Sequence, residues 1–386
     1  MTAPAILEAR GLRVERGGVA VLDIPSFRLE EGELASLIGP NGCGKTTLLL
    51  SLMCLLPRIS GQVLWRGTEI ATGRDAIACR RRMAMVLQEP LLFQATVYEN
   101  VASGLRIRRL PRGEERRKVM AYLERFGLAA FAQRSARKLS GGEARRVSIA
   151  RALAVEPEVV FLDEPFANLD PPTRQAITED LERTIRETGA AAILVTHDQS
   201  EALRMSDRIV VMHRGAIVQS GAPAVVLNEP ANEFVANCMG METIVEGVVV
   251  RRTDGEIVMS VAGCEISAIG EGSPGDPVYC CIRPEHVTID IVNPAGSSSA
   301  RNVFEARIAS VSSVGPYLKV KLDCGFPLVA TVTGESFTTL GLARDRGVFA
   351  SFKATAVHVI RRGDVGHPLA RAGGPDSLPS TGRGDR

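Results

Sequence analysis

The sequence predicts an α/β domain built on a parallel sheet, followed by an all-β domain of two small barrels. Short apolar runs at Leu34–Ile38, Val159–Leu162 and Ala191–Val195 alternate with helical stretches. Such runs are typical of parallel strands that are buried on both faces. By contrast, residues 243–360 are rich in Val, Ile and Thr, with glycine turns and little helical periodicity. This change in texture predicts the second domain.

The composition is that of a globular protein and argues against a nucleic-acid-binding, a secreted or a membrane-spanning protein. A chain of 386 residues is expected to form two or three domains. Lys and Arg (46) nearly balance Asp and Glu (44), so no overall charge favours nucleic acid as a partner. Eight cysteines without zinc-module spacing favour a reducing, cytosolic compartment. The N-terminus lacks signal-peptide features, and the apolar stretch Leu48 to Leu56 is far shorter than the ~20 residues of a spanning helix.

The elements of the first domain, expected over residues 1–240, follow in order. Strands are expected at Ala20–Ile24 and Leu34–Ile38, and the second leads through a glycine loop into a helix over Thr46–Leu56. From Ala76 to Arg151 the pattern is helical and arginine-rich, which predicts a helical subdomain at about 88–139. Its arginines indicate a solvated face rather than a surface that contacts lipid headgroups or the loops of a partner protein.

A phosphate-binding loop lies between the strand and the helix. Its glycines let backbone N–H groups approach phosphate oxygens, and the helix N-terminus adds positive potential. Lys45 is expected to reach the terminal phosphates, and Thr46 to hold Mg²⁺. For Cys43 we expect a space-filling role, although a thiol at a helix N-terminus can also be reactive. The pattern G-x-x-x-x-G-K-[ST] is matched by Gly39, Pro40, Asn41, Gly42, Cys43, Gly44, Lys45 and Thr46, and Thr47 follows.

Two carboxylates end the apolar run at Val159–Leu162, where ligands gather in doubly wound sheets. Asp163 is expected to bind Mg²⁺ through water, and Glu164 to polarise the water that attacks the γ-phosphate. An Asp-Glu pair alone is usually a solvated strand end. After a phosphate loop it predicts a catalytic pair.

Further motifs follow in a fixed order: Leu139-Ser140-Gly141-Gly142-Glu143, a helix to Ala154, the carboxylate strand, Asn168-Leu169-Asp170 and His197. Over residues 4–236 this arrangement resembles the ATP-binding subunit of an ABC transporter. The resemblance implies ATP and Mg²⁺ as cofactors and a homodimer that ATP holds together.

The resemblance also implies roles for single residues. Gln88 would sense Mg²⁺ and the permease, and would join Thr46 and Asp163 as a metal residue. The loop of Ser140, Gly141 and Gly142 in one subunit would close on the γ-phosphate bound by the other. Asp170 would line the dimer seam, and His197 would contact the γ-phosphate.

Two residues depart from the family pattern. Glu143 stands where the family usually has Gln; a carboxylate suits a helix N-terminus but adds negative charge near phosphate. Arg16 stands where the family has an aromatic residue that stacks on adenine, and a guanidinium can stack on a base in its place.

The second domain, expected over 241–362, carries an internal repeat. Val278, Ile282 and Val287 match Val348, Phe352 and Val357 at a common offset. We expect two OB-like barrels at about 243–292 and 299–361, with a disordered tail at 363–386. The segment Ile282-Arg283-Pro284-Glu285-His286 resembles regulatory domains of bacterial import ATPases.

The second barrel resembles the molybdate-binding small-barrel family around Ser299-Ala-Arg301-Asn302, Thr333-Gly-Glu-Ser336 and Phe352-Lys353-Ala354. Hydroxyls, backbone N–H groups and a cation suit a tetrahedral dianion. Ser299, Arg301, Ser336 and Lys353 are the candidates. The alternative is a barrel that has kept its shape and lost its ligand.

The predicted function is ATP hydrolysis that energises import of an oxyanion, with molybdate or tungstate as the favoured cargo. The protein is expected at the cytoplasmic face of the inner membrane. The implied partners are a second ATPase subunit, a transmembrane permease and, indirectly, a periplasmic or extracellular binding protein. Sulfate, ferric ion, polyamine or sugar remain alternative cargoes. A non-transport ABC ATPase is a more distant alternative, because such proteins usually carry two cassettes.

Overall fold

The computed structural model describes residues 4–58, 60–70, 73–253, 255–296 and 298–362. It divides into two compact units, Met1–Pro230 and Ala231–Arg386. The expected boundary at 240 is wrong, because helix α9 (Glu233–Cys238) belongs to the second unit. There Ala236 packs in one apolar cluster with Cys281 and Ile360. The expected tail at 363–386 lies outside the described residues.

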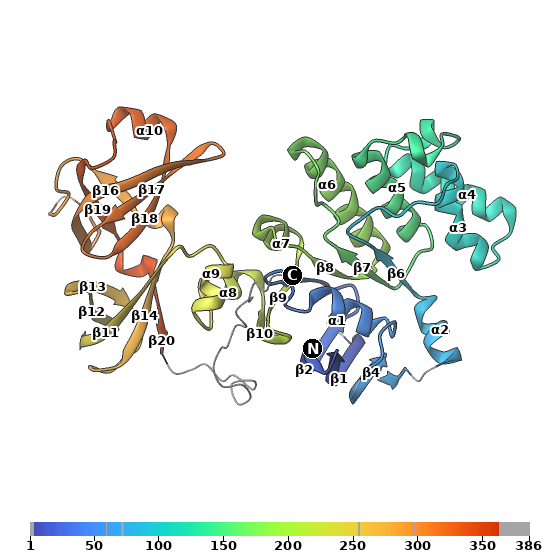
Figure 1. Ribbon diagram of the computed structural model, residues 1–386, viewed down its shortest axis with the longest axis horizontal. Helices are drawn as coiled ribbons and strands as arrows, with labels where there is room; N and C mark the ends of the chain where they lie inside the picture. Colours follow the sequence, from blue (N-terminus) through green and yellow to red (C-terminus); the bar gives the residue numbers. More distant parts are fainter. Residues whose placement is uncertain (1–3, 59, 71–72, 254, 297, 363–386) are drawn as a thin grey trace, which may run out of the picture. The chain divides into compact units, whose positions relative to one another are not determined.

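A six-stranded sheet forms the centre of the first unit, in the order β10-β9-β3-β8-β7-β6 (Figure 1). The strands from β9 to β6 pair in parallel, and β10 pairs with β9 antiparallel. Their bounds are β3 Leu34–Ile38, β6 Met83–Val86, β7 Val159–Asp163, β8 Ala191–Val195, β9 Arg208–His213 and β10 Ala216–Gly221.

The central strands are apolar throughout because each face covers a different core. In β7, Val159 and Phe161 pack toward the core shared with the antiparallel sheet, whereas Val160 and Leu162 pack toward the helices. With no side of the strand facing water, alternation with polar residues is lost. The first polar residues after these runs therefore lie at the carboxyl edge of the sheet.

An antiparallel sheet and a set of helices cover the two faces. The sheet has the order β2-β1-β4-β5, with β1 Ala5–Arg16, β2 Val19–Glu30, β4 Ser60–Trp65 and β5 Thr68–Glu69. The helices are α1 Lys45–Leu52, α2 Arg74–Arg80, α3 Val97–Ile107, α4 Arg112–Arg125, α5 Gly141–Leu153, α6 Pro171–Thr188, α7 Gln199–Met205 and α8 Pro223–Asn228. Helix α3 packs against α4 and α5 (Figure 1).

Two sequence-based expectations about these elements are wrong. Helix α1 ends at Leu52 and not at Leu56, because Cys54 takes a left-handed backbone with φ 53°. The stretch from Ala76 to Arg151 is not helical throughout, since β6 interrupts it.

Among the residues that the structure describes, none of the helices combines the length and the apolar composition of a membrane span.

Two five-stranded sheets form the second unit, in the orders β13-β12-β11-β14-β20 and β15-β19-β16-β17-β18. The strands of the first are β11 Thr243–Thr253, β12 Glu256–Val261, β13 Cys264–Ile269, β14 Pro277–Ile282 and β20 Val357–Arg361. Those of the second are β15 Thr288–Asp290, β16 Asn302–Val314, β17 Tyr317–Asp323, β18 Pro327–Thr333 and β19 Gly347–Phe352, with helix α10 Gly334–Thr339 following β18.

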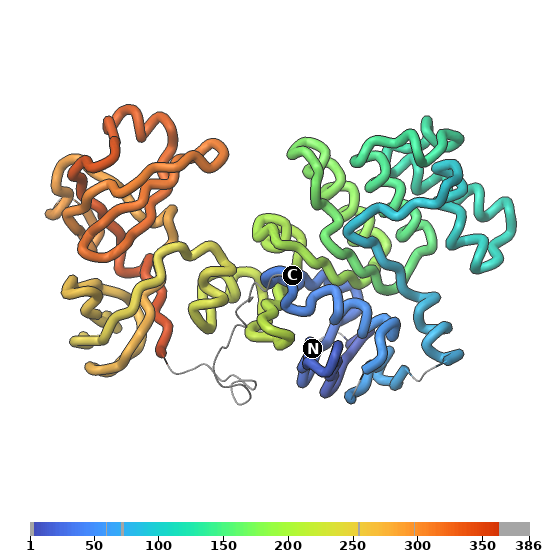
Figure 2. Tube along the Cα trace, viewed as in Figure 1, coloured from blue at the N-terminus to red at the C-terminus, as the bar shows by residue number. Residues whose placement is uncertain are grey.

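The two repeats exchange their final strands. Strand β15 ends the first repeat but pairs with β19 of the second. Strand β20 ends the second repeat but pairs with β14 of the first, beside which the red end of the tube runs in Figure 2. The expectation of two successive barrels at 243–292 and 299–361 is therefore wrong in detail, since each sheet is completed by the other repeat.

Candidate functional site

A cavity of about 760 Å³ opens at the carboxyl edge of the central sheet. It is lined by residues from the end of β1, from β2, from the loop before α1 and the first turn of α1, from the segment after β6, and from the ends of β7 and β8. The structure thus brings together residues that are far apart in sequence. They are Arg16, Val21, Gly39, Pro40, Asn41, Gly42, Gly44, Lys45, Thr46, Thr47, Gln88, Asp163, Glu164, Val195 and His197.

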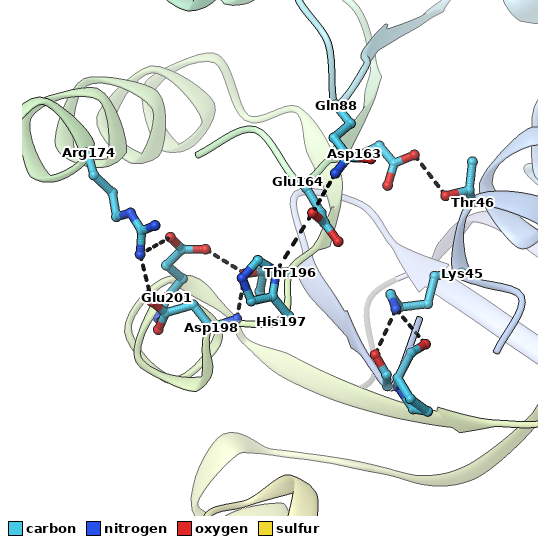
Figure 3. A network of polar contacts seen from close by, with 12 residues as sticks. Lys45, Thr46, Gln88, Asp163, Glu164, Arg174, Thr196, His197, Asp198 and Glu201 are labelled. Atoms are coloured by element: carbon cyan, nitrogen blue, oxygen red, sulfur yellow. Dashed lines mark hydrogen bonds and ion pairs between the residues drawn. The ribbon is translucent and has the colours of Figure 1, made fainter. Parts of the chain in front are cut away.

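The glycines of the phosphate loop are required by a close backbone approach at Gly39 and by a left-handed backbone at Gly42 and Gly44. A Cβ atom at Gly39 would lie 2.3 Å from the carbonyl oxygen of Met212. Gly44 has φ 105° and precedes α1 without a side-chain cap, so the first N–H groups of α1 face the cavity mouth without a competing acceptor. Lys45 Nζ donates to the carbonyl oxygens of Gly39, at 2.7 Å, and Pro40, at 3.0 Å (Figure 3). This loop has the chemistry of an anion site.

Thr46 and Asp163 place two hard oxygen atoms side by side. The Thr46 hydroxyl donates to Asp163 Oδ2 at 2.9 Å, as Figure 3 shows. Burial raises the pKa of the Asp163 carboxyl, while the Thr46 hydrogen bond opposes the rise. A buried carboxylate that is costly to ionise gains from a nearby cation. The donor set therefore suits a divalent cation that prefers oxygen ligands.

Glu164 lies at the centre of the cavity's polar groups. Its backbone has φ 45°, a left-handed conformation that costs a side-chain-bearing residue about 1–2 kcal/mol. Its N–H donates to the carbonyl of Val195 at 3.0 Å. Glu164 Oε2 accepts a hydrogen bond from Gln88 Nε2 at 3.0 Å and lies 3.7 Å from His197 Nδ1 (Figure 3). The carboxylate is thus aimed between β7 and β8, where a water could be polarised.

Cys43 has the space-filling role and not the reactive one. Its side chain is buried, and its Sγ would lie 2.8 Å from a Cβ at Gly39. Burial raises the pKa of the thiol more than Lys45 lowers it. The Cys43 side chain belongs to the core cluster beneath the loop and is not among the residues that line the cavity.

The departure at Glu143 has a structural reason. Glu143 Oε2 accepts from the N–H of Ser140 at 2.7 Å, and Ser140 Oγ accepts from the N–H of Glu143 at 3.3 Å. This reciprocal capping box begins helix α5. The Ser140 hydrogen bond lowers the pKa of Glu143, and Arg134 lies 3.5 Å away. The extra charge is therefore used at the helix terminus.

The remaining predicted nucleotide residues lie on a separate surface. Asp170 caps helix α6 by accepting from the N–H of Thr173 at 3.1 Å, which lowers the pKa of Asp170. A Cβ at Gly142 would lie 3.0 Å from Thr173, so this loop and the α6 N-terminus adjoin. Ser140, Gly141, Gly142 and Asp170 are not among the residues that line the cavity.

The four oxyanion candidates do not line one cavity among the described residues. Lys353 lines a cavity of about 660 Å³. Arg301 instead pairs with Glu256 at 3.4 Å, and Ser336 lies in the first turn of α10, which Thr333 caps. Ser299 is exposed and its neighbours line the cavity in its place. The lining residues are His286, Thr288, Asp290, Pro294, Ser298, Ala300, Ser351, Phe352, Lys353, Thr355 and Ala356.

Sequence reasoning missed the polar groups that support the site. Arg145 is buried and donates to the carbonyl oxygens of Leu87, at 2.7 Å, and Gln88. Asp198 caps α7 directly after His197, with Glu201 three residues on. That spacing is a recognisable helix-start pattern. It would have shown that the histidine precedes a helix, but not that Arg174 of α6 contacts Asp198.

Comparison with known proteins gives the same assignment. Residues 22–167 match the ABC transporter family and residues 298–359 the TOBE domain. The chain is 40% identical to the molybdate/tungstate import ATP-binding protein WtpC of Pyrococcus horikoshii, over 86% of this chain and 94% of that protein. It is 36% identical to the spermidine/putrescine import ATP-binding protein PotA of Clostridium novyi, over 74% and 81%.

A solved structure supports the fold of the first unit. It is cbiO1 of Clostridium perfringens, part of the ABC transporter complex cbiONQ, with 31% identity and a TM-score of 0.55. The match covers 62% of this chain and 96% of that one. With the phosphate loop, the carboxylate pair and the histidine in one cavity, these likenesses lead to one conclusion: the chain belongs to the ABC transporter family, as an ATP-binding subunit with ATPase activity.

Proposed function

We propose that this ATPase acts as a homodimer at the cytoplasmic face of the membrane, and energises import of molybdate or tungstate through a separate permease. The observation that carries the ATPase part is the convergence of Lys45, Glu164 and His197 on one cavity. Lys45 and the α1 amides bind the phosphates. Glu164 accepts the proton of the attacking water.

Supporting groups fix the geometry of that step. Gln88 holds the Glu164 carboxylate by donating to Oε2. His197 Nδ1 lies 3.7 Å from the same oxygen, and its imidazole would contact the γ-phosphate. Thr46 and Asp163, with Gln88 beside them, would hold Mg²⁺, which supplies positive charge to the phosphates. Arg16 lines the mouth, where its guanidinium would stack on the base.

The dimer proposal rests on the surface formed by Ser140, Gly142 and Asp170. These residues lie together at the N-termini of α5 and α6, outside the cavity of their own chain. Ser140 Oγ caps helix α5 by accepting from the N–H of Glu143, which places the hydroxyl at this helix terminus. A second copy would present this surface to the γ-phosphate.

The oxyanion cargo is favoured by the cavity around Lys353. It combines this ammonium with hydroxyls of Thr288, Ser351 and Thr355, and one carboxylate, Asp290. A dianion is matched by such donors, whereas a polyamine or ferric ion requires several carboxylates. The WtpC likeness points to the same cargo. A periplasmic or extracellular protein would deliver the anion to the permease.

Calorimetry of the full chain with tungstate, molybdate and sulfate tests the anion site. Heat from the metal oxyanions is expected, and should be lost in Lys353→Ala. Lys319→Ala is the matched control, because Lys319 pairs with Glu242 in the same unit at 2.6 Å. Equal affinity for sulfate would contradict the cargo.

Uptake of tungstate by cells that express this chain with its permease tests the transport role. Lys45→Ala should abolish uptake together with ATP binding. Uptake that persists without ATP binding would exclude the proposed function.

A further inference from the structure

The position of His197 is not set by packing of its own ring. The side chain is 63% exposed. Its neighbours in sequence are held much more firmly: Thr196 is 2% exposed, and Asp198 caps helix α7. The orientation of the imidazole therefore depends on how Thr196 and Asp198 are fixed.

A polar network fixes both neighbours. The Thr196 hydroxyl donates to Glu201 Oε2 at 2.5 Å and accepts from the N–H of Asp198 at 3.0 Å. Asp198 Oδ1 in turn accepts from the N–H groups of Ser200, at 2.9 Å, and Glu201, at 3.3 Å. Burial raises the pKa of Glu201, whose charged form needs a cation nearby.

That cation comes from another element. Arg174, in the first turns of α6, places Nη1 3.0 Å from Asp198 Oδ2 and 3.8 Å from Glu201 Oε1 (Figure 3). Its Nε is buried and has no acceptor among the described residues. The guanidinium of Arg174 thus contacts both carboxylates although its Nε–H group, a buried donor, has no acceptor among the described residues.

Arg174 is also tied to the predicted dimer surface. Its backbone N–H donates to the carbonyl of Asp170 at 2.9 Å, one helical turn earlier. A displacement of the Asp170 loop therefore moves Arg174, and through it the two carboxylates beside His197.

We propose that Arg174 is a positioning residue that aligns His197 for ATP hydrolysis and couples this alignment to the Asp170 loop. The alignment part rests on the established ATPase. The coupling part rests on the proposed dimer.

Arg174→Met tests the alignment in the full chain. The kcat for ATP should fall about ten- to a hundred-fold, as small misplacements of a reacting group do. The KM for ATP should stay within about twofold, because phosphate binding by Lys45 is untouched. Arg174→Lys keeps the positive charge but loses the planar guanidinium that can contact two carboxylates, so it should recover part of the rate. A kcat within twofold of the parent in Arg174→Met would overturn the proposal.

The decisive readout is the same substitution made in His197→Ala. If Arg174 acts through His197, its removal from that background leaves the single-turnover rate unchanged. An equal loss in both backgrounds would assign Arg174 a merely structural role. Asp198→Asn weakens the same contact from α7 and must give the same pattern, so misfolding of one variant leaves the other decisive.

Arg186→Met is the matched control. Arg186 lies on the same helix and makes a two-pronged ion pair with Asp207, at 2.8 and 2.9 Å. Its loss should lower stability but not kcat. Asp170→Ala separates a failure of the dimer proposal from a failure of the alignment proposal. If only the dimer proposal fails, Asp170→Ala leaves the His197-dependent rate unchanged, whereas Arg174→Met still lowers it.

Discussion

Replacing Glu164 with glutamine removes a proton acceptor while keeping almost every ground-state contact. The amide oxygen can still accept from Gln88, whose Nε2 lies 3.0 Å from the carboxylate. The left-handed backbone, with φ 45°, costs both side chains the same. The loss is therefore confined to general-base catalysis, about 10²–10⁴-fold in kcat. At 1.36 kcal/mol per tenfold, the barrier rises by about 2.7–5.4 kcal/mol.

Steady-state ATPase rates, nucleotide affinity and gel filtration with ATP should be measured together. We expect little turnover, unchanged ATP binding and an ATP-trapped dimer. Glu156→Gln is the matched control, since Glu156 also has a left-handed backbone, with φ 48°, and pairs with Lys118 away from the cavity. Parent-like turnover in Glu164→Gln would refute the assignment of the base.

Two further predictions follow from burial. Maleimide should label Cys43 slowly at pH 7, because the thiol is buried and its pKa is raised. The labelling rate should be no faster in a nucleotide-free sample than with ATP. Rapid labelling of Cys43, mapped by mass spectrometry, would contradict this. Asp163→Asn should raise the melting temperature of the nucleotide-free protein at pH 7. Burial raises the folded-state pKa of this carboxyl, so its ionisation costs stability as pH rises above the ordinary value near 3.9. The gain should shrink toward pH 4, and a gain independent of pH would refute the cause.

Much of the first unit was predictable because its central strands are bounded apolar runs. Leu34–Ile38 and Ala191–Val195 begin and end where the sequence predicts. The short strand Met83–Val86 was not recognised, since arginines precede it and its apolar run is brief. Cavity residues followed from motif spacing. The contacts of Arg174 did not, because they join α6 to α7.

The second unit was less predictable for a physical reason. Its repeats have matching patterns, so local sequence cannot decide which copy β15 and β20 will pair with. The same limit applies to the anion candidates. A motif places Arg301 near Ser299 in sequence, but the carboxylate of Glu256, on another strand, attracts its guanidinium.

The exchange of final strands has a consequence for biosynthesis. The first sheet of the second unit lacks its β20 edge until residues 357–361 have been made. During translation β14 would therefore present an unpaired edge while about 75 further residues are added, at ~5–20 residues per second. Open edges invite pairing with other chains. The nascent second unit should thus be the aggregation-prone part of this protein, and its folding slow, because closure requires contacts between distant residues.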